Sequence, residues 1–227
     1  MGMNTSARPA APRKRRAGRP SGDDQDLRAH LLGVATTQFS RMGIAATSLR
    51  MIAGEANVTP AMLHYYFGDK PRLVQAVIDE QLLPALMPLR AQMKRAGSDP
   101  AVLIEAFVSG IAGVMSSHPW LPTLWVREVL CEGGELREVL FDQVVPGLPQ
   151  WLAQCFAAAQ ADGRLNADLD PRLLVVSLVG LTLFPAAGAP IWRRAFGAEG
   201  LGPEVMLKHT LALLDRGVGT ATSGEAA

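Results

Sequence analysis

Apolar residues recur at spacings of three and four positions along most of the chain, a pattern that predicts amphipathic α-helices. No segment shows the strict alternation of a half-buried strand, and the sequence contains no internal repeat or glycine-rich nucleotide loop. The sequence therefore predicts an all-α protein, with helices over residues 23–42, 48–56, 60–67, 71–82, 100–117, 121–130, 136–145, 148–161, 171–184 and 203–218.

Two short helices separated by an asparagine turn make residues 47–70 the most informative stretch. Thr47 or Ser48 is placed to cap the first helix, and Asn57 suits the left-handed conformation of a tight turn. Thr59-Pro60 suits the start of the second helix, as cap and first helical residue. The side chains expected to face inward are those of Leu49, Ile52, Ala53, Ala56, Val58, Leu63 and Phe67.

The outward face of the second helix predicts a contact with nucleic acid. Small groups at its N-terminus allow close approach, and rings that form hydrogen bonds follow one turn later. The positive end of the helix dipole favours phosphate. An ordinary helical hairpin fits the pattern equally well, and the residues that project outward are Thr59, Pro60, Ala61, His64 and Tyr65.

The stretch resembles the N-terminal domain of the TetR/AcrR family of bacterial transcriptional regulators. The family signature after the turn is a Val, a capping Ser or Thr, a Leu, an aromatic pair with Phe, and a Gly/Ser-x-Lys step. The resemblance covers about Leu27 to Ala76, and His64 departs from it because the family more often has Tyr there. The matching residues are Val58, Thr59, Leu63, Tyr65-Tyr66-Phe67 and Gly68-Asp69-Lys70.

The resemblance implies a helix-turn-helix that binds a double-stranded DNA operator. Arg50 is the candidate for a bidentate pair with a guanine, and Lys70 for a phosphate contact. The side chains that the resemblance assigns to DNA are Ser48, Arg50, Thr59, Pro60, Ala61, Met62, His64, Tyr65, Tyr66 and Lys70.

The resemblance also implies the domain organisation. A three-helix DNA-binding domain is expected over residues 23–83, with its motif at about 48–67, and a larger helical domain for effector binding and dimerisation over 84–218. The helix after Lys70 would connect the two domains, and Pro84 and Pro88 are expected to interrupt or kink the chain beyond that helix.

The ends of the chain differ from its middle in composition. Residues 1–22 are rich in Ala, Pro, Gly and Arg and are expected to form a disordered basic arm. The run Arg13-Lys14-Arg15-Arg16 suits DNA phosphates or a narrow minor groove, although a solubilising tail would have the same composition. Residues 219–227 are expected to form a disordered tail.

The net charge of +1 conceals an asymmetry. Residues 1–72 hold 11 Lys and Arg against 5 Asp and Glu, which gives +6, and the remaining residues hold 11 against 16, which gives −5. A basic end beside an acidic remainder favours a DNA contact at that end alone. The alternative, a protein that compacts DNA without sequence preference, would need basic residues along much of the chain.

Two further features bear on the cellular location. The thiols of Cys131 and Cys155 lack the spacing of a disulfide framework or a zinc site, so two buried thiols in a bacterial cytoplasm are expected. Residues 173–192 are uncharged and long enough to span a bilayer, but Pro185, Gly188 and Pro190 favour a buried helix of about three turns followed by a loop. We expect no membrane contact.

The second domain is expected to hold a small, largely hydrophobic effector, as the resemblance implies. Ordinary packing in the hydrophobic core would equally explain each of the apolar candidates named next. Candidates for the wall are Phe107, Ile111, Met115, Trp120, Trp125, Phe141, Trp151 and Phe156. Candidates for polar contacts are His118, Arg127, Glu128, Cys131 and Thr182, although Arg127 and Glu128 also fit a solvated pair.

Two helices of this domain, residues 171–184 and 203–218, are apolar on more than one face, which favours a homodimer. An enzyme is not expected, because the four histidines lie in separate segments and no HExxH, GxSxG or paired-carboxylate motif is present. No cofactor or metal is expected. The most favoured interpretation is a homodimeric repressor released from a palindromic operator by its effector.

Overall fold

The structure, a computed structural model, describes residues 22–144 and 146–218, and the expected arm and tail lie outside this part of the chain. The described residues form helices and no strand, as predicted. In chain order the elements are α1 (Gly22–Met42), α2 (Leu49–Glu55), α3 (Pro60–Phe67), α4 (Lys70–Val77), the π-helical segment η1 (Ile78–Leu82), α5 (Leu83–Ala96), α6 (Pro100–Ser117), α7 (Leu121–Trp125), the π-helical segment η2 (Val126–Leu130), α8 (Arg137–Val139), the π-helical segment η3 (Leu140–Val144), α9 (Leu148–Ala161), α10 (Pro171–Ala187), α11 (Ala189–Phe196) and α12 (Pro203–Val218).

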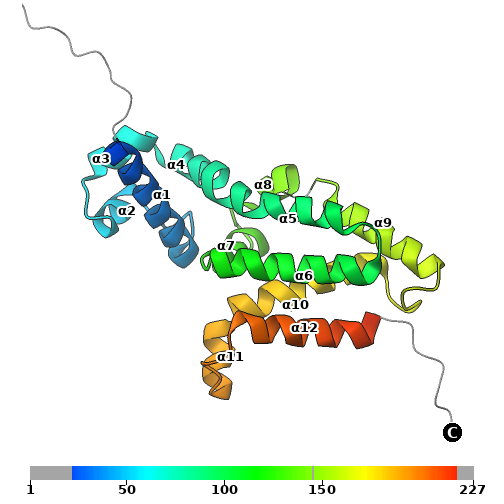
Figure 1. Cartoon of the computed structure of the whole chain (residues 1–227). Helices are drawn as coiled ribbons and strands as arrows, with labels where there is room; N and C mark the ends of the chain where they lie inside the picture. Colours follow the sequence, from blue (N-terminus) through cyan, green and yellow to red (C-terminus); the bar gives the residue numbers. More distant parts are fainter. Residues whose placement is uncertain (1–21, 145, 219–227) are drawn as a thin grey trace, which may run out of the picture.

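Helices α1 to α3 lie together at one end of the molecule, and we call α1 to α4 the head (Figure 1). Apolar side chains from each of them are buried against one another, among them Leu31, Phe39, Ile52, Leu63 and Leu73. This burial supplies the main free energy that holds such short helices in place. Gly43, with φ of +89°, ends α1 as the sequence predicts.

Arg28 of α1 contacts both η1 and α3. The Arg28 guanidinium donates to both carboxylate oxygens of Glu80 in η1, at 2.5 and 2.7 Å, and lies 4.9 Å from the centre of the Phe67 ring. The hydrogen bond from Arg28 lowers the pKa of the Glu80 carboxyl. The pair links α1 to η1, which follows α4.

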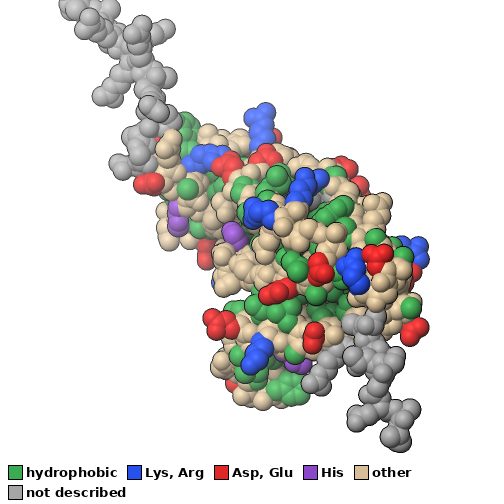
Figure 2. All heavy atoms as spheres, turned by 45° about the vertical axis from the view of Figure 1, so that its right-hand side comes forward, with side chains coloured by type: hydrophobic (Ala, Val, Ile, Leu, Met, Phe, Trp, Pro, Cys, Tyr) green, Lys and Arg blue, Asp and Glu red, His purple; other side chains and the backbone are tan. Residues whose placement is uncertain are grey.

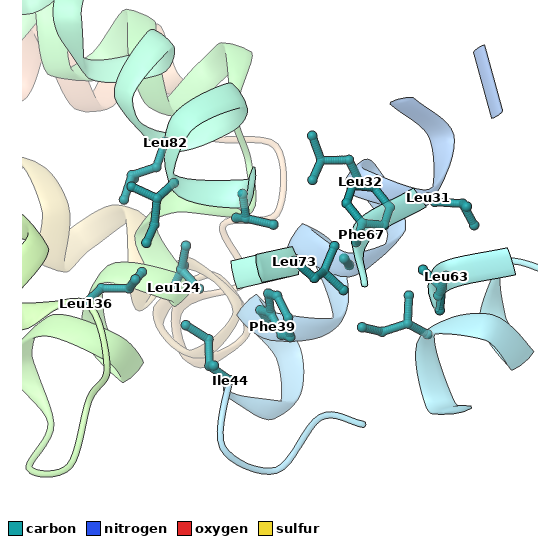
Figure 3. Packing of buried hydrophobic residues seen from close by; sticks show 14 of the residues in the cluster. Leu31, Leu32, Phe39, Ile44, Leu63, Phe67, Leu73, Leu82, Leu124 and Leu136 are labelled. Atoms are coloured by element: carbon teal, nitrogen blue, oxygen red, sulfur yellow. The ribbon is translucent and has the colours of Figure 1, made fainter. Parts of the chain in front are cut away.

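The core of the head continues into the body, by which we mean α5 to α12 with η2 and η3. Leu121, Leu124, Val129 and Leu136 belong to the same buried cluster as the head residues. Figure 3 shows Phe39 and Leu73 at the centre of this cluster, with Leu82, Leu124 and Leu136 on one side and Leu63 and Phe67 on the other. The head is therefore packed against the body over an apolar surface.

Pro84 and Pro88 were expected to interrupt or kink the chain, and they do not interrupt it, because the chain stays helical from Lys70 to Ala96. The irregularity falls earlier, in η1, where the Leu83 N–H bonds to the Ile78 carbonyl five residues back. A proline ring displaces the carbonyl four residues before it, and the wider π turn gives that carbonyl room. Leu82, Ala85, Leu89 and Met93 remain buried along this path, so packing maintains the helix.

The body has a second buried cluster formed by α5, α6, α9, α10 and α12. α6 lies along α5 and is also packed against α10 and α12 (Figure 1). Phe107, Leu152, Phe156 and Leu178 are buried at its centre. The bounds of α6, α9 and α12 agree with the predicted ranges because local residues mark both ends of each helix, such as the Asp99 cap before Pro100.

The expectation of a three-turn helix followed by a loop at residues 173–192 was wrong. α10 continues through Pro185 to Ala187, and α11 follows at an angle of 68°. Pro185 lies inside α10 and removes one hydrogen bond near the C-terminal end of the helix, and Pro190 suits the first turn of α11. The indole N–H of Trp192 donates to the Pro185 carbonyl at 2.8 Å and holds the bend.

Within the described residues, α6 is long and apolar enough to cross a membrane, and so is the bent pair of α10 and α11. The core helix of a soluble protein has the same length and composition, so these properties do not distinguish the two.

Candidate DNA-binding face and effector cavity

The turn between α2 and α3 has the geometry that the sequence predicts. The Ser48 hydroxyl, rather than that of Thr47, caps α2 by accepting from the Met51 N–H at 3.2 Å. Thr47 is buried and donates to the Gly43 carbonyl at 2.7 Å. Asn57 has φ of 55°, the left-handed conformation that asparagine tolerates. Thr59 precedes α3 in the cap position, but its side chain makes no capping hydrogen bond.

The N-terminal half of α3 presents an exposed face. Thr59, Pro60, Ala61, His64 and Tyr65 are all exposed, and the Tyr65 side chain is 76% exposed. Leu63 and Phe67, on the other side of α3, are buried in the head. This face presents the hydroxyl groups of Thr59 and Tyr65 and the imidazole of His64 to an outside partner.

Ser48 and Arg50, at the start of α2, are also exposed. α2 and α3 pack directly against each other, which places the start of α2 in the same unit as the exposed face of α3. Arg50 forms no ion pair with a described carboxylate, so its guanidinium donors are available to an outside acceptor.

His64 is oriented by its own backbone neighbour. Its Nδ1 lies 2.5 Å from the Gly68 carbonyl, which can only accept, so Nδ1 carries the proton. The neutral ring then offers Nε2 as an acceptor. This geometry suits an exocyclic amino group of a base, and donation to phosphate requires the protonated ring.

Tyr66 and Lys70 are engaged within the head. The Tyr66 hydroxyl donates to the Asp24 carboxylate of α1, and this bond raises the pKa of the phenol to about 12. The Lys70 ammonium donates to the Ala45 carbonyl at 3.0 Å. Both side chains are partly buried, as is Met62, so their predicted DNA contacts have less support than those of the exposed face.

Glu128, a candidate for effector binding, instead joins the head to the body. Its side chain is 4% exposed, and its Oε1 accepts from the Ile44 N–H at 2.8 Å. Its Oε2 accepts from the Glu135 N–H at 3.0 Å. The carboxylate thus connects the loop between α1 and α2, next to Gly43, with the loop after η2. Arg127 is exposed, so the two residues do not form the solvated pair that the sequence also allowed.

An apolar cavity of about 110 Å³ lies inside the body, and we call it the effector cavity after the ligand that the sequence predicts for this domain. Four of the candidate wall residues line it, namely Phe107, Ile111, Met115 and Trp125. The Trp125 indole N–H is buried and has no hydrogen-bond partner. Sequence reasoning missed the aliphatic wall, because nothing in the pattern separates cavity residues from core residues. These residues are Leu86, Leu89, Val114, Leu121, Leu140, Leu148, Pro149, Leu152, Val175, Val179 and Leu183.

The other candidates do not line this cavity. Phe156 and Trp151 pack into the core of the body, and Phe141 and Cys131 are exposed. The expectation of two buried thiols was therefore wrong, since Cys131 is exposed and Cys155 is only partly buried. His118 ends α6, where its Nδ1 bonds to the Val114 carbonyl at 3.0 Å and its ring meets that of Trp120 edge to face. Thr182 lines a neighbouring pocket instead.

A row of exposed apolar residues runs along α10, which we call the α10 stripe. Leu173, Val176 and Phe184 are 63%, 65% and 76% exposed, and Gly180 lies between them with open space where a side chain would be. Ile191 and Phe196 of α11, and Val205 and Leu213 of α12, are also exposed. An apolar surface of this kind on neighbouring helices is typical of an interaction surface.

Comparison with known proteins supports the same interpretation. Residues 31–77 match the family model described as bacterial regulatory proteins, tetR family. The chain is 38% identical over 203 residues to an HTH-type transcriptional regulator of Mycobacterium bovis, Mb3439c, covering 89% of this chain and 93% of that protein. It is 27% identical over 197 residues to the probable acrEF/envCD operon repressor of Escherichia coli, covering 79% and 86% of the two chains.

Among solved structures, the fold is similar to the ketosteroid transcriptional regulator KstR2 of Mycobacterium tuberculosis, with a TM-score of 0.68 at 19% identity. The similarity covers 88% of this chain and 99% of that one. The helix-turn-helix, the match over residues 31–77 and the nearly full-length relative lead to one assignment: the chain belongs to the TetR family of bacterial transcriptional regulators.

Proposed function

We propose that the protein is a homodimeric, cytoplasmic repressor that binds a palindromic operator through α3 and leaves it when a small hydrophobic effector occupies the effector cavity. The exposed face of α3, in which five neighbouring residues point away from the core of the head, is the observation that carries this proposal. Membership of a family of DNA-binding regulators supports it.

DNA contact is proposed at the exposed face and at the start of α2. Thr59, whose hydroxyl is not used as a cap, and Ser48 would bond to phosphate oxygens. Arg50 and Tyr65 would reach base edges or the backbone in the major groove. In a dimer, two copies of α3 about 34–36 Å apart would match two half-sites one helical turn apart.

The surface argues against a protein that compacts DNA without sequence preference. Such a protein needs basic side chains over much of its surface. On the face drawn in Figure 2, Lys and Arg side chains are interspersed with Asp and Glu. Residues 73–227 carry 11 basic and 16 acidic side chains. No DNA contact is therefore proposed for the body.

The effector cavity suits a compact apolar ligand with one hydrogen-bond acceptor. Its wall is aliphatic and aromatic, and the Trp125 N–H is the unpaired buried donor among the side chains that line it. A buried donor without a partner costs about 1–3 kcal/mol, which a ligand carbonyl or ether oxygen would recover. The cavity would therefore prefer effectors that place a hydrogen-bond acceptor near the Trp125 N–H.

Coupling between the cavity and the head is proposed to pass through α7 and η2. Trp125 lines the cavity, and Glu128, three residues later, binds the Ile44 N–H of the head. Because α7 continues directly into η2, a ligand that displaces Trp125 would also displace Glu128. Such a shift would alter the angle of the head and the spacing of the two α3 helices.

The test is a fluorescence-anisotropy titration of the protein against its own upstream intergenic DNA and a scrambled duplex at physiological salt, with the oligomer mass recorded in parallel. A dimer that binds the upstream duplex at least about a thousandfold more tightly than the scramble is the expected result. Equal, weak binding to both duplexes, and to the remaining intergenic sequences of the genome, would contradict the proposal.

Arg50→Ala should relax sequence preference at one base pair of each half-site. Loss of a bidentate guanine contact costs about 1–3 kcal/mol against the preferred base and little against the others. Competition binding with single-base operator variants measures this. An equal loss of affinity on every sequence would assign Arg50 to the phosphate backbone instead.

A further inference from the structure

A second pocket lies beside the effector cavity, and nothing in the proposed function uses it. Its volume is about 290 Å³, and α6, α10, α11 and α12 contribute most of its wall. Met115 lines both sites and separates them. This volume approaches that of typical small-molecule pockets. We call it the Arg193 pocket after the one charged side chain in its wall.

Arg193 is held in the wall by two contacts. Its Nη2 donates to the Leu201 carbonyl at 2.8 Å, and its guanidinium lies 5.4 Å from the centre of the Trp192 ring. The Trp192 indole is itself anchored to the Pro185 carbonyl. The guanidinium is therefore fixed in position before any ligand arrives, which lowers the entropy cost of binding.

The charge of Arg193 has no counterion within the described part of the chain. None of the ion pairs between described residues includes it. Its Nε–H is buried without an acceptor. A buried donor on a charged group is costly to leave unpaired, and a carboxylate is the acceptor that a guanidinium fits best.

The other residues of the pocket wall indicate the polarity of the rest of the ligand. Hydroxyl groups come from Ser116, from Thr182, which is bonded to its own helix, and from Thr210, which is buried. The other lining residues are mainly Ala, Val, Leu, Met and Pro. A ligand that fits has a short apolar body and one anionic end.

We propose that the Arg193 pocket is a second ligand site, separate from the effector cavity, which binds a small monocarboxylic acid with its carboxylate on Arg193 and its hydrocarbon part against Met115 and Leu207.

Octanoate and its neutral isostere octanamide test this on the full-length protein, with binding measured by isothermal titration calorimetry at neutral pH. Octanoate should bind one molecule per chain, at least about tenfold more tightly than octanamide, since a charge-assisted hydrogen bond replaces a neutral one. Equal affinity for the two compounds, or binding of neither, would overturn the proposal. This comparison needs no variant.

Three variants locate the site. Arg193→Gln should reduce octanoate affinity to that of octanamide, while Arg194→Gln, which changes the exposed neighbour on the same turn, should leave it unchanged. Val179→Phe, which narrows only the effector cavity, should also leave it unchanged. If Val179→Phe abolishes octanoate binding and Arg193→Gln does not, the acid binds in the effector cavity and the proposal fails. Helical circular dichroism confirms that each variant is folded.

Discussion

Replacing Glu128 by alanine is expected to lower the free energy of unfolding by about 2–5 kcal/mol, because two backbone N–H groups lose their acceptor at once. The N–H of Ile44 and that of Glu135 both donate to this carboxylate, and its surroundings are buried. Denaturant unfolding of the dimer at fixed protein concentration measures the change. The same variant should weaken the response of operator binding to the effector, because the bond between η2 and the head is lost.

Two further variants separate this role from a general effect of charge. Glu132→Ala, which removes an exposed carboxylate from the following loop, should change the stability by less than about 0.5 kcal/mol. Glu128→Gln retains one oxygen acceptor and should fall between the wild type and Glu128→Ala. A Glu128→Ala protein with unchanged stability and an unchanged effector response would show that the two bonds contribute nothing to coupling.

The other large effect is expected in the α10 stripe. Val176→Asp should convert the proposed dimer into a monomer, because an unpaired carboxylate would be buried at the centre of an apolar contact. A monomer presents one α3 to one half-site, so operator affinity should fall by at least about a hundredfold. Analytical ultracentrifugation and anisotropy titration of the same sample measure both quantities.

Met87→Asp is the matched control for this substitution. Met87 is an exposed apolar residue on α5, 56% exposed, and does not belong to the stripe. The Met87→Asp variant should have the oligomer mass and the operator affinity of the wild type. If Val176→Asp also remains a dimer with full affinity, the subunits meet through another surface, and the exposed residues of α10 need a different explanation.

The helix-turn-helix could be predicted from the sequence because its determinants are local. Asn57 supplies the left-handed turn and Pro60 starts the second helix, and both signals lie within the residues they organise. The same holds for α9 and α12: Gly147 directly precedes α9, and Pro203 is the first residue of α12. Short-range chemistry therefore determined both where these elements form and which side of α3 is exposed.

The features that depend on distant residues were not predictable in this way. Glu128 follows Arg127 within an otherwise apolar segment and resembles a ligand-binding group in the sequence, but its partners include Ile44, 84 positions away. The cavity wall combines aliphatic residues from several helices, and their spacing is that of any core. α11 was missed because Gly188 and Pro190 were interpreted as breaks, whereas here they mark a helix junction.

The shared cluster that joins α1, α4 and α7 also bears on how this protein could evolve or be engineered. The head buries apolar side chains against Leu121 and Leu124 of the body, so it is not an independent structural unit. Excised at residue 83, it would expose that face to water and lose cooperativity with the rest of the chain. Chimaeras that exchange DNA specificity between relatives should therefore carry the α7–η2 segment with the head, because the two share one buried core.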